Sequence, residues 1–157
     1  MFVLRIMSGE ELTAKKLLED KGYKVICPRK LKVERNKTVE RIIFTGYLFL
    51  DINSISDRDY YKIKDTVNVI SFLDSKYNLS ETDEKYIRLL NNNDKALDKI
   101  DVYFDKDKKA IIYMNEYDEY INTKNVIRVN ARDKTITFRF NIDDIVKDVT
   151  FNYNEIA

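Results

Sequence analysis

A cluster of four polar residues, Asn91 to Asp94, divides the chain into two parts with different hydrophobic periods. Asparagine and aspartate favour turns, so four in succession are not expected to contribute to a core. Before the cluster, strand-like apolar runs alternate with segments of helical spacing. After it, short segments of period two follow one another between polar turns. The sequence therefore predicts two small domains, residues 1–91 and 99–157, joined by a linker at residues 92–98.

The first part has the pattern of a mixed α/β domain. Helices are expected after the turn at Ser8-Gly9, after Ser56 as an N-cap, and from Ser80. The run from Ile42 to Ile52 is the most continuous apolar segment, so we expect a central strand in which Gly46 marks a bulge or kink. The strands predicted in this part lie at residues 2–7, 23–28, 42–52 and 67–73.

The second part has the pattern of a small all-β domain. Its apolar segments alternate with period two or are rich in β-branched residues, and turn residues separate them. They lie at residues 101–105, 110–114, 126–130, 135–142 and 149–153. Short strands with no helical pattern between them predict a small antiparallel barrel. The predicted fold class is thus α+β, an α/β domain followed by a β-barrel.

The composition argues against a catalytic or metal-binding protein. The chain has no His, which removes the commonest general base and transition-metal ligand. Its one cysteine, Cys27, cannot form an internal disulfide or, unaided, a zinc site. The three glycines are isolated, so no glycine-rich phosphate loop is present. We therefore expect a protein that is not an enzyme, with no catalytic residues, no metal and no cofactor.

The charge balance, the N-terminal segment and the short apolar runs indicate a soluble protein. There are 28 Lys and Arg against 27 Asp and Glu, a net charge of +1, which predicts no global attraction to nucleic acid or membranes. The N-terminal segment lacks the basic start and apolar stretch of a signal peptide. No apolar run approaches the roughly 20 residues that span a bilayer. We expect a cytoplasmic monomer.

Positive charge is concentrated between residues 21 and 41, where eight Lys and Arg stand against Glu34 and Glu40, a local charge of +6. The alternation of residues 29–41 around Asn36-Lys37 is typical of a protruding β-hairpin or a mobile loop rather than of a core element. The positive charge of such a hairpin favours binding to the phosphates of a nucleic-acid backbone. The alternative is a solvated hairpin whose charges only keep a sheet edge from aggregating. Residues 1–93 contain 17 Lys and Arg against 14 Asp and Glu, a net charge of +3, whereas residues 94–157 contain 11 against 13, a net charge of −2. We therefore assign any nucleic-acid contact to the first domain. The candidate contacts are Arg29, Lys30, Lys32, Arg35, Lys37 and Arg41.

Aromatic residues surround Gly46. Strand alternation places Tyr47 and Phe49 on one face and Leu48 and Leu50 on the other. If helices cover only the leucine face, the aromatic face is an apolar docking surface for a partner's helix. The alternative is that both faces are covered and all of these residues belong to the core.

Three segments together resemble the family of NusG-type transcription elongation factors: Phe2-Val-Leu-Arg-Ile-Met-Ser-Gly-Glu-Glu, Gly22-Tyr-Lys-Val-Ile-Cys-Pro and Phe44-Thr-Gly-Tyr-Leu-Phe-Leu. The third looks like the family's Phe-Pro-Gly-Tyr signature with Thr45 in place of Pro. The resemblance covers about the first 90 residues. The strands from Val126 onward look like the family's KOW-type barrel, but residues 94–157 lack the glycines that a KOW motif carries. In this respect the chain looks more like a specialised paralogue, of the RfaH or LoaP kind.

The resemblance implies an antiparallel sheet with helices, followed by a small KOW or SH3-like barrel. It also implies docking on the β′ clamp helices of RNA polymerase, which favours processive elongation or antitermination. The docking residues implied by position are Phe44, Tyr47 and Phe49, with Phe72 and Ile87 at the edges.

Nucleic acid and further proteins are also implied as partners. The basic hairpin would lie toward upstream DNA, the non-template strand or nascent RNA, and the barrel's usual partners are Rho or a ribosomal protein. The missing glycines leave the barrel's partners open. The alternative function is an RNA-binding regulator that recognises a leader hairpin through residues 29–41.

Overall fold

The computed structural model describes residues 1–73, 78–114, 119–121, 126–142 and 145–156. Its contacts divide the chain into two compact units. Unit 1 comprises Met1–Pro28 and Ile42–Asp94, and unit 2 comprises Arg29–Arg41 and Lys95–Ala157. Helices occur in the first unit and strands dominate the second, so the predicted α+β fold class is confirmed.

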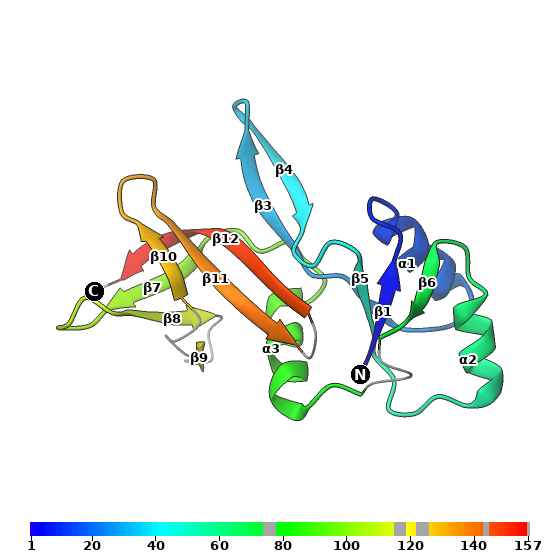
Figure 1. Ribbon diagram of the computed structural model, residues 1–157. Coiled ribbons are helices and arrows are strands. Elements are labelled where there is room, and N and C mark those ends of the chain that lie inside the picture. The colour runs from blue at the N-terminus through cyan, green and yellow to red at the C-terminus, as the bar shows by residue number, and fades with distance from the viewer. Residues whose placement is uncertain (74–77, 115–118, 122–125, 143–144, 157) are drawn as a thin grey trace. The chain divides into compact units, whose positions relative to one another are not determined.

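Unit 1 is built on a four-stranded sheet in the order β2-β5-β1-β6, and its neighbouring strands are antiparallel (Figure 1). The elements that the structure describes in this unit are β1 (Phe2–Ile6), α1 (Glu11–Asp20), β2 (Val25–Ile26), β5 (Tyr47–Leu50), α2 (Asp57–Lys64), β6 (Val69–Phe72) and α3 (Glu81–Asn91).

One face of this sheet forms the core of unit 1 together with α1 and α2. Alternate residues of β1 and β5 point to this face, because side chains along a strand alternate between its two sides. They pack with Ala14 and Leu18 of α1 and with Ile63 of α2, all fully buried. Burial of each leucine or isoleucine side chain contributes on the order of 1.5–3 kcal/mol. The strand residues of the cluster include Phe2, Leu4, Ile6, Leu48 and Leu50.

Polar residues set the ends of α2 and α3. The Ser56 hydroxyl accepts a hydrogen bond from the Asp59 backbone N–H at 3.1 Å, and Ser80 accepts one from Asp83 at 3.2 Å. The sequence predicts an N-cap at Ser56 and a helix that starts at Ser80, and both predictions are confirmed. Asn92 ends α3 in the left-handed conformation at φ 50°, which asparagine tolerates better than most residues.

The prediction of one continuous strand from Ile42 to Ile52 is wrong. β4 (Lys37–Ile42) ends at Ile42, and β5 begins only at Tyr47. Between them the chain turns, and the Tyr47 N–H bonds the Phe44 carbonyl at 3.1 Å. Gly46 has φ +86°, a conformation that is incompatible with an extended strand and that glycine adopts without strain. Gly46 therefore marks the break between two strands.

Unit 2 contains a six-stranded sheet and a two-stranded hairpin. In the sheet, β12 pairs antiparallel with β11 up to Asn152 and then parallel with β7 from Tyr153 onward. The five strands expected in this part of the chain are present, and β9 is an additional one. In the order β10-β11-β12-β7-β8-β9, the sheet strands are β10 (Val126–Asn130), β11 (Thr135–Ile142), β12 (Ile145–Ile156), β7 (Ile100–Phe104), β8 (Ala110–Met114) and β9 (Glu119–Ile121).

The hairpin of β3 (Arg29–Glu34) and β4 is tied to unit 2 through Leu97. The Leu97 N–H donates to the Arg29 carbonyl at 2.8 Å, and the Leu31 N–H donates to the Leu97 carbonyl at 2.7 Å. These contacts group the hairpin with unit 2. The charge distribution along the sequence, by contrast, assigns the expected nucleic-acid contact of the hairpin to the first domain. The pairing joins residues more than 60 positions apart, which a local pattern does not reveal.

Candidate functional site

The aromatic face of unit 1 is the face of β1 and β5 opposite the core cluster that includes α1 and α2, and it is itself largely covered, because Val3, Phe44 and Phe49 are fully buried. In the β1–β5 register Val3 lies opposite Phe49, and Arg5 lies opposite Tyr47. These side chains share one side of the sheet, because the alternate residues of both strands belong to the core cluster. The Phe44 ring packs edge-on against Phe49 with 5.5 Å between ring centroids. The structure thus brings together three of the predicted docking residues, Phe44, Tyr47 and Phe49.

These docking residues differ in accessibility. Phe44, Phe49 and Ile87 are fully buried, whereas Tyr47 is half-buried. Beside Tyr47, Arg5 is exposed. A fully buried side chain cannot contact a partner in this conformation. Tyr47 is therefore the predicted docking residue that is accessible here.

Phe72 does not lie on the aromatic face. Its ring stacks on Tyr60 of α2, with centroids 5.0 Å apart and an interplanar angle of 20°. Phe72 pairs with Leu4 across β1 and β6 and belongs to the same core cluster as Leu4. It thus contributes to the packing between the sheet and α2.

Sequence reasoning missed a buried carboxylate that supports this face. Glu11, in the first turn of α1, is 1% exposed. Its carboxylate accepts hydrogen bonds from the Gly9 N–H at 3.1 and 3.2 Å and from the Gly46 N–H at 2.9 Å. A carboxylate at a helix N-terminus is also favoured by the helix dipole. Glu11 thereby holds the turn that leads into Tyr47.

A second missed contact ties α3 to the end of β5. Asp51 accepts hydrogen bonds from Arg88 at 2.6 and 3.1 Å, and the Lys24 ammonium lies 3.1 Å away. The Arg88 hydrogen bonds, followed by those of Lys24, lower the pKa of Asp51 to about 2 despite its burial. The Asp51 and Glu84 carboxylates in turn raise the pKa of Arg88. Asp51 therefore stays ionised throughout the neutral range.

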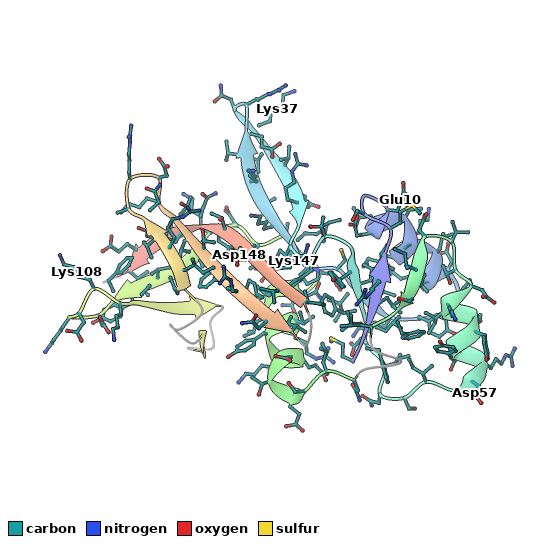
Figure 2. All side chains as sticks on the ribbon, in the orientation of Figure 1. Glu10, Lys37, Asp57, Lys108, Lys147 and Asp148 are labelled. Carbon is teal, nitrogen blue, oxygen red and sulfur yellow. The ribbon has the colours of Figure 1, made fainter. Side chains whose placement is uncertain are left out.

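The basic hairpin has an exposed tip. Arg35 and Asn36 form its turn with φ 48° and 63°, one residue before the predicted centre at Asn36-Lys37. Figure 2 shows Lys37 at this end of the hairpin. Among the residues that the structure describes, neither Arg35 nor Lys37 has an acidic partner within 4 Å, although both are exposed.

Three other cations of the hairpin are paired with its own glutamates. Arg29 lies 2.7 Å from Glu40, Lys32 lies 3.6 Å from Glu34, and Arg41 Nε donates to Glu34 at 3.2 Å. The Arg41 hydrogen bonds lower the pKa of Glu34. Surface pairs of this kind contribute only about 0–1 kcal/mol, so a phosphate can compete for these cations.

Lys30, the sixth predicted contact, points toward β12. Its ammonium donates a hydrogen bond to the Thr150 carbonyl and lies 5.6 Å from the centroid of the Phe151 ring. Burial, and secondarily the neighbouring Lys32, lower the pKa of Lys30. Lys30 is therefore part of the body of unit 2 rather than of the hairpin tip.

The described residues contain neither a membrane-spanning helix nor a metal-binding cluster. No helix within that part of the chain is long and apolar enough to cross a bilayer. The same residues contain no group of three or more His, Cys, Asp or Glu side chains arranged to hold a metal ion.

Comparison with known proteins identifies the family. The family model described as "Transcription termination factor nusG" matches residues 1–91, more than half of the chain, so the chain belongs to the NusG family. This confirms the resemblance seen in the sequence, while the specialised kind of paralogue stays a prediction. No curated protein matches the chain.

A solved structure agrees with this fold. Thermotoga maritima NusG, in a structure of its domain interaction, is similar over 96% of this chain and 92% of that chain, with 13% identity and a TM-score of 0.59. At this identity the similarity shows the fold alone. An MjSpt4:Spt5 complex matches with 15% identity over 96% of this chain and 91% of that chain, but its TM-score of 0.33 is too low to support an argument.

Proposed function

We propose that the protein binds RNA polymerase at the β′ clamp helices through the aromatic face of unit 1 and thereby promotes processive elongation. Membership of the NusG family supports a role in transcription elongation in general. The position of the docking site goes beyond family membership. It is supported by the partly exposed Tyr47, which directly follows a turn held by the hydrogen bond between Gly46 and Glu11.

The surroundings of Tyr47 suit a docking contact. Tyrosine is enriched among the residues that dominate binding energy at protein interfaces, because it offers a large, rigid surface and a polar tip. The exposed Arg5 lies opposite Tyr47 in the register and adds a cation to the same face. The Glu11–Gly46 hydrogen bond fixes the turn before Tyr47, so little conformational entropy remains to be lost on binding.

The buried members of the predicted set act in a different way. We propose that Phe44 and Phe49, packed edge-on, support the strand beneath Tyr47. Ile87 and Phe72 contribute through the packing of α3 and α2. Direct contact of any of these four with a partner requires that they first be uncovered.

The proposed mechanism is a shift between clamp conformations, with no catalytic step by this protein. A bound factor favours processive elongation only if it binds the closed clamp more tightly than the open one. Co-purification of the full chain with RNA polymerase tests the docking step. Recovery of polymerase with the wild type but not with Tyr47→Ala supports the proposal, and failure of the wild type to retain polymerase contradicts it.

A second proposed function is contact with nucleic acid through the hairpin of residues 29–41. Arg35 and Lys37 at the tip favour it, because both are exposed and neither has an acidic partner within 4 Å among the residues that the structure describes. The ligand would be nascent RNA or the upstream or non-template DNA beside a transcribing polymerase. Reversal of both charges, Arg35→Glu with Lys37→Glu, should then lower the affinity for oligonucleotides and weaken its salt dependence.

A further inference from the structure

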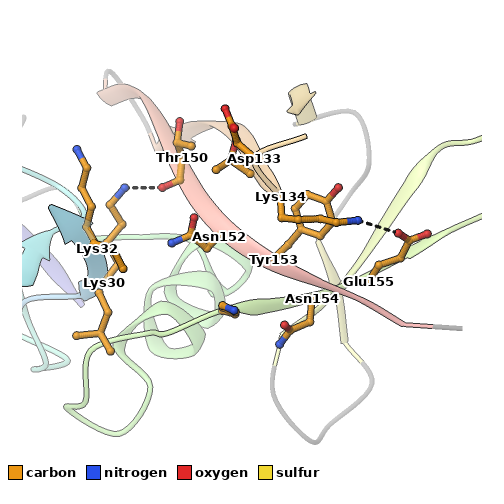
Figure 3. Close-up of a pocket in the computed structure, with 13 residues that line it drawn as sticks. Lys30, Lys32, Asp133, Lys134, Thr150, Asn152, Tyr153, Asn154 and Glu155 are labelled. Carbon is orange, nitrogen blue, oxygen red and sulfur yellow. Dashed lines mark hydrogen bonds and ion pairs between the residues drawn. The ribbon is translucent and has the colours of Figure 1, made fainter. Parts of the chain in front are cut away.

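Unit 2 contains a groove of about 980 Å³ between the hairpin and the sheet (Figure 3). β3 lines one side with Lys30 and Lys32, which share a face because they are two residues apart. β12 lines the other side with Thr150, Asn152 and Asn154. Every residue that lines the groove belongs to unit 2.

The groove carries an excess of positive charge. Its four lysines face two acidic residues, Asp133 and Glu155, which leaves two positive charges in excess. Lys134 lies 3.4 Å from Glu155 and is partly neutralised by it. In the part of the chain that the structure describes, Lys30 and Lys99 have no acidic side chain within 4 Å. The lysines are Lys30, Lys32, Lys99 and Lys134.

The β12 wall offers hydrogen-bonding groups, and its aromatic lining residue, Tyr153, is buried at 3% exposure. Along β12 the side chains alternate, so Phe151 is buried at 2% exposure whereas Thr150, Asn152 and Asn154 line the groove. Thr135 of β11 lies opposite Asn152 and extends this polar wall. Amides, hydroxyls and ammonium groups can bond phosphate and sugar oxygens. Bases, by contrast, need exposed aromatic faces on which to stack.

We propose that this groove binds the phosphodiester backbone of a single nucleic-acid strand without reading its bases. The proposal extends the second proposed function, because it adds to the hairpin a binding surface that includes Lys99, just before β7, and Lys134, just before β11. A small-molecule ligand fits less well, since such sites are lined mainly by apolar and aromatic side chains. An anion beside Lys30 would also offset the burial and the Lys32 charge that lower its pKa.

The test measures binding of the purified full chain to fluorescent oligonucleotides of about twelve nucleotides, oligo(rU) and oligo(dT), by fluorescence anisotropy. The groove variant is Lys99→Glu with Lys134→Glu. The matched control is Lys106→Glu with Lys108→Glu, the same charge change at two exposed lysines outside the groove. If the groove variant is not folded by circular dichroism, Lys99→Gln with Lys134→Gln replaces it.

We expect the groove variant to bind at least roughly 10-fold more weakly than the control, with a slope of log K against log salt smaller by about 1.4 for two lost phosphate contacts. Similar affinity for a mixed-sequence strand is expected, since the bases are not read. Preference for RNA or DNA identifies the source of the strand, and either supports the proposal. Equal weakening in groove and control variants would overturn it, as would full competition by poly-glutamate.

The same assay separates this proposal from those on which it depends. If Arg35→Glu with Lys37→Glu abolishes binding while the groove variant binds normally, the hairpin proposal stands and the groove proposal is wrong. If the wild type binds no oligonucleotide at low salt, both nucleic-acid proposals are wrong. Neither result bears on docking to polymerase, which involves unit 1.

Discussion

The buried carboxylate of Glu11 accepts a hydrogen bond from the backbone N–H of Gly46 at 2.9 Å. This contact joins the first turn of α1 to the turn that precedes β5, across 35 residues of sequence. The same carboxylate bonds the Gly9 N–H, so two loops at one end of the sheet share one anchor. Because Tyr47 follows Gly46 directly, this anchor sets the position of the accessible aromatic residue on the proposed docking face.

Substitution Glu11→Gln should destabilise unit 1 by about 2 kcal/mol. Hydrogen bonds to a charged acceptor contribute roughly 1.5–3 kcal/mol, and the new amide would turn an N–H toward a backbone donor. Urea denaturation followed by circular dichroism measures the change. The control is Asp20→Asn, which removes one negative charge from an exposed position on the same helix. Equal stability of the two variants would contradict the anchoring role of Glu11.

Asp51 should make unit 1 more stable at neutral than at acidic pH. Its pKa of about 2 lies below its ordinary value of 3.8, so the stability it contributes is present above the unfolded pKa and is lost as pH falls through the folded pKa. The shift corresponds to roughly 2 kcal/mol at neutral pH. Asp51→Asn should therefore destabilise the protein by about this amount at about pH 7.

The pH dependence provides the check on Asp51. The difference in urea midpoint between wild type and Asp51→Asn should shrink steadily between about pH 5 and about pH 2, as the wild-type carboxylate takes up its proton. Arg88→Met, which removes the main hydrogen-bond donor, should reduce the same difference. A midpoint difference that stays constant over this range would show that the Arg88–Asp51 contact contributes no pH-dependent stability.

Tyr23 should make stability decline at alkaline pH. Burial, reinforced by the 2.7 Å hydrogen bond to Asp59, raises its pKa to about 12 from 10.0. The folded state holds the phenolic proton that the unfolded state releases, so stability falls as pH rises between about 10 and 12. Tyr23→Phe should remove this part of the decline, measured as the difference in urea midpoint from wild type. Parallel pH profiles would contradict the assignment.

Local signals predicted part of the fold. Ser56 and Ser80 sit immediately before the helices they cap, and a cap depends only on residues within one turn. The period-two alternation of Ile136, Phe138 and Phe140 likewise predicts their shared burial on β11. In both cases the determining contacts lie close together along the chain.

The remaining features depend on contacts between distant segments. The side of the sheet on which Phe72 lies follows from the β1–β6 register, which is irregular between Arg5 and Ile6. The role of Glu11 depends on Gly46, and the association of the hairpin with unit 2 depends on Leu97. None of these pairings leaves a periodic trace in the sequence. The aromatic composition near Gly46 could suggest a docking face but not which of its rings are buried.

Docking through Tyr47 is the central claim, and its most direct test is the affinity of the full chain for a purified β′ clamp-helix fragment. Tyr47→Ala should weaken binding at least about 10-fold, because interface tyrosines commonly contribute more than 1 kcal/mol. The matched control is Tyr61→Ala, which removes a tyrosine that is 60% exposed on α2. Unchanged affinity of Tyr47→Ala, or equal loss in Tyr61→Ala, would contradict the account.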